Sequence, residues 1–342
     1  MNVLVLGGTN FIGAHAVRRL ISQGHNVTVF HRGETEAKLP EGVQHVYGDR
    51  KNLANHAVTF RNLKPDVVLD TLAMVEKDAE NVMRVFPSLA ERLVVLSSGD
   101  VYRAYDRLTG KDPGPPDPTP LTEASPLRDK LYHYRDNASS PDDRSYYYDK
   151  ILVERAVMRQ PDLLPTTVLR LPMVFGPGDY QHRLFPYLKR MDDQRPHILL
   201  AKNLAGLRVL RGYAEDMAEA IALCVTSEKA ANRVYHVAYP DNFTEEQWVH
   251  LIAEAAGWRG NVLQLPEEAF PENQRHGLDT RQDWSLDSSH IREELGYREA
   301  VSVEEALRRA VAWERANPPD NIPMERFDYA AEDRTITAYN EE

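Results

Sequence analysis

Cysteine is almost absent from this 342-residue chain, since Cys224 is the only one. A single cysteine excludes an internal disulfide and is typical of a reducing compartment, so we expect a cytoplasmic protein. A basic excess is also missing: the net charge of -11 argues against nucleic acid as a partner, because phosphate binding needs clustered Lys and Arg. Long apolar runs are lacking too. The N-terminal VLVLG is too short for a signal-peptide core, has no basic flank and is better interpreted as a buried strand, and no segment is long enough to span a membrane.

The remaining composition is that of an ordinary globular protein, with 42% hydrophobic and 27% charged residues. The length allows one large core or two sub-domains that share a cleft. In the first half, helical patterns such as 14–24 and 78–92 alternate with short apolar runs at 2–7, 26–32, 43–49, 66–73 and 92–102. Apolar β-branched strands separated by helices predict an α/β fold with a doubly wound parallel sheet of the Rossmann type.

The second half interleaves strands predicted at 166–176 and 234–238 with helices predicted at 146–158, 215–228, 244–257 and 302–317, followed by an irregular tail after Asn317. We therefore assign residues 1–175, completed by 206–238, to a dinucleotide-binding domain. Residues 176–205 and 239–342 are assigned to a smaller, interleaved substrate-binding sub-domain and tail. The proline-rich segment 103–145 lacks periodicity, which fits a surface excursion and a lid over the substrate equally well.

The first strand leads into GGTNFIG, Gly7 to Gly13, and then into an apolar helical pattern. In a strand–loop–helix nucleotide site, the outer glycines permit a tight turn and close packing, and the pyrophosphate rests on the helix N-terminus. Asn10 stands where the central glycine is usual. Because asparagine tolerates a positive φ better than other non-glycine residues, the turn can still form, and the Asn10 amide can donate to a phosphate. The flanking strands and helix strengthen the prediction of a cofactor site.

The end of the second strand reads Phe30-His31-Arg32-Gly33 and holds no acid. An acid there would bind the adenosine ribose hydroxyls of NAD, whereas a basic residue accepts a 2′-phosphate, so Arg32, with His31 beside it, favours NADP over NAD. The alternative is that Arg32 is a solvated surface charge. Asp49 in YGDR is placed to accept a hydrogen bond from the adenine amino group.

Tyr146 precedes Lys150 by four residues in SYYYDK. On a helix this spacing puts both side chains on one face, where the ammonium lowers the pKa of the phenol toward the range that a general acid–base needs. Tyr147 and Tyr148 would point elsewhere on such a helix; a solvated helix face is the alternative interpretation of the pair. Ser98 ends a buried strand, at the edge of the sheet where ligands bind, and is expected to hydrogen-bond a substrate carbonyl or hydroxyl.

These segments, with LRLPMVFGPGD, RGYAEDMAEAI and DSSHIREELGY, make the sequence resemble the extended short-chain dehydrogenases/reductases over nearly its whole length. That family includes NAD-dependent epimerases and dehydratases. The resemblance implies a catalytic triad of Ser98, Tyr146 and Lys150, in which tyrosine exchanges a proton with the substrate while hydride passes to or from nicotinamide. It also implies that lysine binds the nicotinamide ribose, that Arg211 binds a substrate phosphate, and that homodimers form through the helix at 78–92 and the one starting at Tyr146.

The expected contacts fall into two sets. The cofactor is expected to contact Gly7, Gly8, Thr9, Asn10, Phe11, Ile12, Gly13, His31, Arg32, Asp49, Arg50, Leu72, Ala73, Ser97, Pro172 and Val174. The substrate is expected to contact Gly99, Met173 and Arg211, and no metal is expected. For Ser97, a capping or turn role is an equally simple interpretation.

Departures from the family pattern bear on the reaction. Nucleotide-sugar dehydratases of the family carry an Asp-Glu pair after the catalytic Thr or Ser, where this chain has Gly99-Asp100. This disfavours 4,6-dehydration, although Asp100 can still act as an extra base. Sugar epimerases usually carry an asparagine at the place of Met173, where it contacts the substrate diphosphate. The segment from Tyr102 to Tyr146 is longer than usual, which favours a remodelled lid.

Three functions therefore stay open. The first is an epimerase/dehydratase-type enzyme that acts on a sugar or nucleotide sugar, and the second is an NADPH-dependent reductase of a small carbonyl compound. The third is a degenerate nucleotide- or RNA-binding protein, because GGTxFIG, FxRG and GDR also resemble a subgroup that includes chloroplast stem-loop RNA-binding proteins. The negative charge and the Tyr–Lys pair argue against RNA, and neither nucleic acid nor a membrane is expected as a partner.

Overall fold

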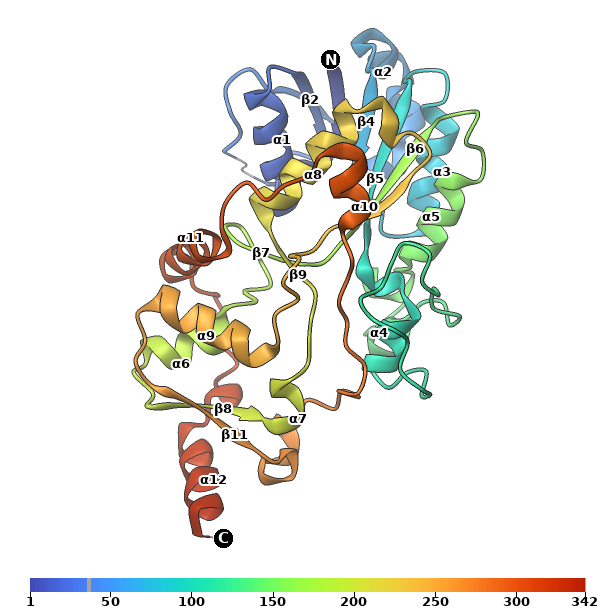
Figure 1. The fold of residues 1–342 in the computed structure, drawn as a ribbon. Helices are drawn as coiled ribbons and strands as arrows, with labels where there is room; N and C mark the ends of the chain where they lie inside the picture. The colour runs from blue at the N-terminus through green and yellow to red at the C-terminus, as the bar shows by residue number, and fades with distance from the viewer. Residues whose placement is uncertain (36–37, 342) are drawn as a thin grey trace.

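The computed structural model, which describes residues 1–35 and 38–341, is built around a seven-stranded parallel sheet (Figure 1). Its strand order is β10-β6-β5-β4-β1-β2-β3, and every neighbouring pair is parallel. The strands are β1 (Asn2–Leu6), β2 (Asn26–His31), β3 (Gln44–Tyr47), β4 (Val67–Asp70), β5 (Arg92–Ser98), β6 (Thr166–Leu171) and β10 (Val234–His236). The order reverses direction on either side of β1, which confirms the predicted doubly wound fold.

Both faces of the sheet are covered, because the central strands are apolar on both sides. Leu4 and Leu6 of β1 face one core and Val3 and Val5 face the other, and all four are buried. The helices α1 (Phe11–Ser22) and α8 (Ala214–Thr226) pack together over one face, and α3 (Glu76–Val85) and α5 (Lys150–Met158) pack together over the other, where Phe60 of α2 (Ala57–Leu63) belongs to the same core. This arrangement is what continuous β-branched strands require.

A second group of elements has a core of its own, drawn in the lower part of Figure 1. Its members are α6 (Phe185–Asp192), β8 (His197–Ala201), α7 (Lys202–Ala205), α9 (Glu245–Ala256), β11 (Asn261–Leu265), α11 (Val303–Ala316) and α12 (Tyr329–Glu341). The short pair β7 (Met173–Phe175) and β9 (Arg211–Tyr213) lies between this group and the sheet. The chain also returns to the sheet at α10 (Ser289–Leu295), since Ile291 and Tyr297 are buried in the core beneath α1 and α8.

Three local predictions were wrong. The tail is not wholly irregular, because α12 forms there and is held by ion pairs such as Arg190–Glu332 at 2.7 Å. Segment 103–145 contains the helix α4 (Arg103–Leu108). The helix predicted from Tyr146 begins only at Lys150, because the Asp149 side chain caps it by accepting a 2.9 Å hydrogen bond from the Ile151 backbone amide.

No helix within residues 1–35 and 38–341 combines the length and the apolar character that crossing a bilayer demands.

Candidate active site

The glycine loop between β1 and α1 has the backbone that the sequence predicts at its outer positions. Gly7 and Gly8 have φ values of +96° and +82°, a region that favours glycine. A side chain on Gly13 would place its Cβ 2.9 Å from the Gly8 Cα, so this glycine permits α1 to pack directly on the turn. Asn10, in contrast, has φ -138° and is exposed, so the expected positive φ at this residue is wrong; Phe11, the next residue, takes φ +39°.

The loop fits a dinucleotide. Thr9 is half-buried and Ile12 is partly buried against the core, while Asn10 precedes α1 without making a side-chain cap. The first amides of α1 therefore have no side-chain acceptor from this N-cap residue, and glycine backbone lies where a pyrophosphate must approach closely. The switch between β1 and β4 also lies here, where open α/β sheets bind their ligands.

The residues expected around the adenosine have partners within the chain. Arg32 forms an exposed ion pair with Glu34 at 2.6 Å, and a ring nitrogen of His31 lies 2.8 Å from His45. The Asp49 carboxylate accepts a hydrogen bond from the Lys51 amide at 2.9 Å.

The Arg50 side chain is bound by two carboxylates of the chain. Its guanidinium makes two hydrogen bonds to the Asp70 carboxylate, at 2.8 and 2.9 Å, and an ion pair with Asp78 at 3.1 Å. Asp70 in turn accepts from the Leu72 amide at 2.9 Å. This network orients the loop after β4, which includes Leu72 and Ala73.

The other expected cofactor contacts lie at the ends of neighbouring strands. Leu72 lies against the glycine loop, since a Cβ on Gly7 would be 2.7 Å from its Cγ. Val174 is buried in the core, and Pro172 packs against Gly212. Ser97 is buried, and its hydroxyl donates a 2.5 Å hydrogen bond to Glu154, so its side chain is engaged inside the fold.

The structure does not place Tyr146 and Lys150 on one helix face. Tyr146 ends a separate helical turn, Arg144–Tyr146, whereas Lys150 is the first residue of α5. The Tyr146 ring lies beside the Tyr147 ring and the Arg135 guanidinium, at 4.8 and 4.7 Å. The geometric argument for a Tyr146–Lys150 pair is therefore wrong, because four residues span one helical turn only where the helix is continuous.

Tyr148, and not Tyr146, contacts Asp100 in the structure. Its hydroxyl donates a 3.0 Å hydrogen bond to Oδ2 of Asp100, and the Lys150 Nζ lies 6.0 Å from its ring centroid. The Ser98 hydroxyl accepts from the Asp100 amide at 3.2 Å. Ser98, Asp100 and Lys150 are thus brought together at the carboxyl end of β5, but with Tyr148. The sequence argument missed Tyr148 because it assumed a helix through 146–150.

The electrostatics of this cluster follow from burial. Burial raises the pKa of the Tyr148 phenol well above its usual value, the Asp100 carboxylate raises it further, and Ser98 opposes the shift. Burial also raises the pKa of Asp100, against the opposing effect of Arg128, and Asp100 Oδ1 is buried without a hydrogen-bond partner in the described chain.

Lys150 lies beneath the cluster. Its Nζ donates to the Ala73 and Leu96 carbonyl oxygens, at 2.6 and 2.9 Å. Burial lowers its pKa to about 8, although the nearby carboxylates of Asp100 and Asp70 raise it. The cluster therefore combines a neutral phenol, a buried carboxyl group and a buried ammonium group, which together can hold and move a proton.

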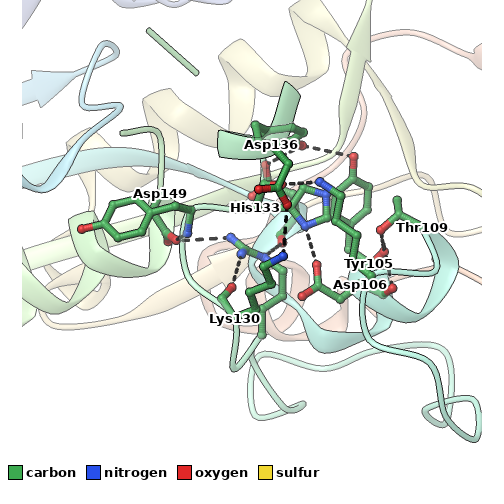
Figure 2. A network of polar contacts seen from close by, with 12 residues as sticks. Tyr105, Asp106, Thr109, Lys130, His133, Asp136 and Asp149 are labelled. Carbon is green, nitrogen blue, oxygen red and sulfur yellow. Dashed lines mark hydrogen bonds and ion pairs between the residues drawn. The ribbon is translucent and has the colours of Figure 1, made fainter. Parts of the chain in front are cut away.

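Segment 103–145 is folded onto this cluster. Figure 2 shows Tyr105, Asp106 and His133 of this segment close together, with Asp106 hydrogen-bonded to the His133 ring. The Tyr134 hydroxyl donates to Asp100 Oδ2 at 3.2 Å and lies 3.1 Å from the Tyr105 hydroxyl. The segment is therefore more than a surface excursion, because it contributes a second phenol to Asp100.

The three expected substrate residues lie together. The Gly99 carbonyl accepts from the Trp284 indole at 3.2 Å, and a Cβ on Gly99 would lie 3.3 Å from the Leu210 side chain. Met173 pairs with Arg211 between β7 and β9. Arg211, however, is ion-paired with Glu245, and both are buried. Within the described residues, no group of His, Cys, Asp or Glu side chains is arranged to hold a metal ion.

Comparison with known proteins agrees with this architecture. Over 274 residues, the chain is 27% identical to 2'-dehydrokanamycin reductase of Streptomyces kanamyceticus, a match that covers 78% of this chain and 70% of the relative. It is 23% identical to chloroplast stem-loop binding protein of 41 kDa b of Arabidopsis thaliana, over 75% of this chain but only 63% of that longer protein. The structure of Thermus thermophilus UDP-glucose 4-epimerase with NAD shares the fold, with a TM-score of 0.65, 23% identity, and coverage of 93% of this chain and 100% of that one.

The model of the NAD dependent epimerase/dehydratase family matches residues 3–238, which run from β1 to the strand β10 at the far edge of the sheet. The match includes the glycine loop, Ser98, Tyr148 and Lys150. The chain therefore belongs to the NAD-dependent epimerase/dehydratase family and is an enzyme of the short-chain dehydrogenase/reductase type.

Proposed function

We propose that this enzyme reduces a ketone on a sugar-like substrate to the alcohol, with Tyr148 supplying the proton. The observation that carries the proposal is the Tyr148–Asp100 hydrogen bond of 3.0 Å above Lys150, at the ligand-binding edge of the sheet. The raised pKa keeps the Tyr148 phenol protonated, which is the state that a carbonyl oxygen requires of its proton donor. The nicotinamide cofactor, when bound, supplies the hydride.

Three residues around Tyr148 have further roles in the proposed reaction. Ser98 lies beside Tyr148 and is placed to orient the substrate oxygen. The Tyr148 and Tyr134 hydroxyls both donate to Oδ2 of Asp100, whose pKa burial raises. In its protonated form Asp100 can return a proton to the Tyr148 phenolate after turnover and regain one from solvent. The Lys150 ammonium stabilises the negative charge that develops on the phenol. The similarity to a relative named as a reductase supports this direction of reaction.

A label-transfer experiment tests the proposal. Purified protein is incubated with NADPH or NADH deuterated at nicotinamide C4 and with a panel of uncharged and amino-sugar ketones. We expect deuterium at one carbinol carbon of the product, with one cofactor consumed for each product molecule. Deuterium-free, epimerised products, together with NAD retained tightly by the purified protein, would instead indicate an epimerase that regenerates its cofactor in each cycle.

We also propose that NADP is preferred to NAD. Arg32 ends β2, and its partner in the structure is the exposed Glu34, an ion pair worth about 0–1 kcal/mol that a 2′-phosphate can replace. Arg32→Ala is expected to lower kcat/KM for NADPH about tenfold and to leave that for NADH nearly unchanged, since only the phosphate contact is lost. Equal losses with both cofactors would contradict the preference. Steady-state kinetics of the wild type and the variant measures kcat/KM for NADPH and for NADH.

A further inference from the structure

Two phenols besides Tyr148 are linked to Asp100. The Tyr134 hydroxyl lies 3.2 Å from Asp100 Oδ2, the same oxygen to which Tyr148 donates, and 3.1 Å from the Tyr105 hydroxyl. A phenol carries one proton and can also accept a hydrogen bond. When Tyr134 donates to Asp100, the proton between the two phenols must therefore come from Tyr105. Tyr105, Tyr134 and Asp100 then form a continuous line of hydrogen bonds that ends beside Tyr148.

Exposure to solvent differs along this line. Asp100 is 4% exposed, whereas Tyr105 and Tyr134 are both partly exposed. In the proposed reaction the Tyr148 hydroxyl faces the bound substrate, and Asp100 replaces the proton that Tyr148 donates. The buried carboxylate must then regain a proton before it can act again. Tyr134 connects this carboxylate to the partly exposed Tyr105.

The backbone next to Tyr134 is fixed by contacts to two other elements. The Asp149 carboxylate, which caps α5, accepts a 2.5 Å hydrogen bond from the Tyr132 amide. The His133 ring is hydrogen-bonded to Asp106 of α4, and both side chains are buried (Figure 2). Helix α4 also carries the second phenol. Buried contacts therefore hold both phenols in place, as a fixed path for protons requires.

We propose that Tyr105 and Tyr134 return to Asp100 the proton that each turnover consumes. The proposal rests on the proposed function and adds to that site two positioning residues, which act through Asp100. The Tyr148 proton goes to the substrate oxygen, and the Asp100 proton goes to the Tyr148 phenolate. The Tyr134 proton then goes to the Asp100 carboxylate, and the Tyr105 proton goes to Tyr134. Water supplies one proton to Tyr105, so each turnover takes one proton from solvent and one hydride from the cofactor.

The electrostatics of Tyr134 require both phenols to act together. Burial raises the pKa of the Tyr134 phenol above its usual value, and Asp100 and Tyr105 raise it further. A free phenolate at Tyr134 is therefore unfavourable. Tyr134 must gain the Tyr105 proton as it gives up its own, which makes the 3.1 Å contact between the phenols a necessary part of the path.

Tyr134→Phe tests the path, because it removes one hydroxyl and keeps the ring. The substrate is the ketone that the wild type reduces fastest in the label-transfer panel. With enzyme in excess, the proton already on Tyr148 is sufficient, so the single-turnover rate should stay within about twofold of the wild type. With substrate in excess, kcat should fall by about 10- to 100-fold and fall further in D₂O, because each later turnover waits for Asp100.

Tyr105→Phe is a second variant, which breaks the line at its other bond. It leaves the contact between Tyr134 and Asp100 in place and should give the same result, an unchanged single-turnover rate with a lowered kcat. It decides the matter if Tyr134→Phe does not fold.

Tyr132→Phe is the matched control, with the same change two residues before Tyr134. The Tyr132 ring centroid lies 3.8 Å from the Arg135 Cζ, and within the described residues its hydroxyl makes no hydrogen bond. Both the single-turnover rate and kcat should stay within about twofold of the wild type.

A titration of Asp100 tests the contact without any turnover. Aspartate is labelled with ¹³C at the carboxyl carbon, and the Asp100 signal is assigned by its loss in Asp100→Asn. Burial raises the pKa of Asp100, and four facing groups lower it: Arg128, Tyr148, Lys150 and Tyr134. Loss of the Tyr134 hydrogen bond should therefore move the Asp100 midpoint to higher pH.

Three results would overturn the proposal. They are an Asp100 midpoint that does not move in Tyr134→Phe, a single-turnover rate that falls together with kcat, and an equal loss of kcat in Tyr132→Phe. An unmoved midpoint in an active reductase would remove the proton path alone. A moved midpoint in a protein that reduces no ketone would instead contradict the proposed function, and the path with it, while confirming the contact between Tyr134 and Asp100.

Discussion

Tyr148→Phe is expected to slow carbonyl reduction by about 10²–10⁴-fold while cofactor affinity stays nearly unchanged. The variant loses only the hydroxyl that contacts Asp100 at 3.0 Å, and the ring keeps its place beside the Tyr134 ring, at 5.3 Å. Single-turnover rates with saturating NADPH measure the chemical step. Cofactor affinity is measured separately by titration, because a loss there would indicate a misfolded loop and not a missing proton donor.

Tyr146→Phe is the matched control, with the same change two residues away. Within the described residues, the Tyr146 ring lies against Arg135 and Tyr147, and its hydroxyl makes no hydrogen bond to Ser98, Asp100 or Lys150. We expect its rate to stay within about twofold of the wild type. The reverse outcome, an inactive Tyr146→Phe and an active Tyr148→Phe, would restore the assignment that the Tyr–Lys spacing predicts and would contradict the geometry around Tyr148.

Lys150→Met is expected to lower the rate by about 10²–10³-fold, because it removes a buried cation from a water-poor site where negative charge develops. Burial lowers the pKa of Lys150 to about 8. In the wild type the ammonium is therefore present at pH 7 and is lost as the pH rises through about 8, so kcat for reduction should fall across that range. The same fall in the variant would show that another group titrates.

Stability gives an independent measurement of the same lysine. The pKa of about 8 in the folded state lies below the usual 10.5, so the unfolded chain binds more protons between these values, and unfolding free energy must rise with pH there. The full shift corresponds to about 3 kcal/mol, a cost that is fully present below pH 8 and is removed by about pH 10.5. Urea unfolding at pH 7.5 and pH 10 should show this rise in the wild type and not in Lys150→Met.

The glycine loop illustrates what local chemistry can predict. Gly7 and Gly8 take positive φ values, and Gly13 leaves room that a Cβ would fill against Gly8. Both requirements act within one strand, one turn and one helix. They could therefore be inferred from residue types alone. At Asn10 the same reasoning failed, because the residue takes an extended backbone and Phe11 takes the left-handed one.

The Tyr–Lys pair illustrates the limit of spacing arguments. The spacing is informative only if the helix includes both residues, and the cap at Asp149 makes α5 start at Lys150, which leaves Tyr146 outside the helix. Asp149 is a residue type that can cap a helix, but no local feature of the sequence shows that α5 starts after it. The Tyr148 hydroxyl instead meets Asp100, and its ring packs against that of Tyr134 from segment 103–145.

The sequence alone determined the doubly wound sheet, the position of the glycine loop and the place of Ser98 and Asp100 at the end of one strand, because strand periodicity and the ends of parallel strands are local properties. Tertiary structure decided which tyrosine meets Asp100 and which anion meets Arg211. Tyr148 contacts a residue 48 positions away, and Arg211 one 34 positions away. Such partners are selected by burial, since a buried charge or phenol must find a hydrogen-bond partner wherever the fold provides one.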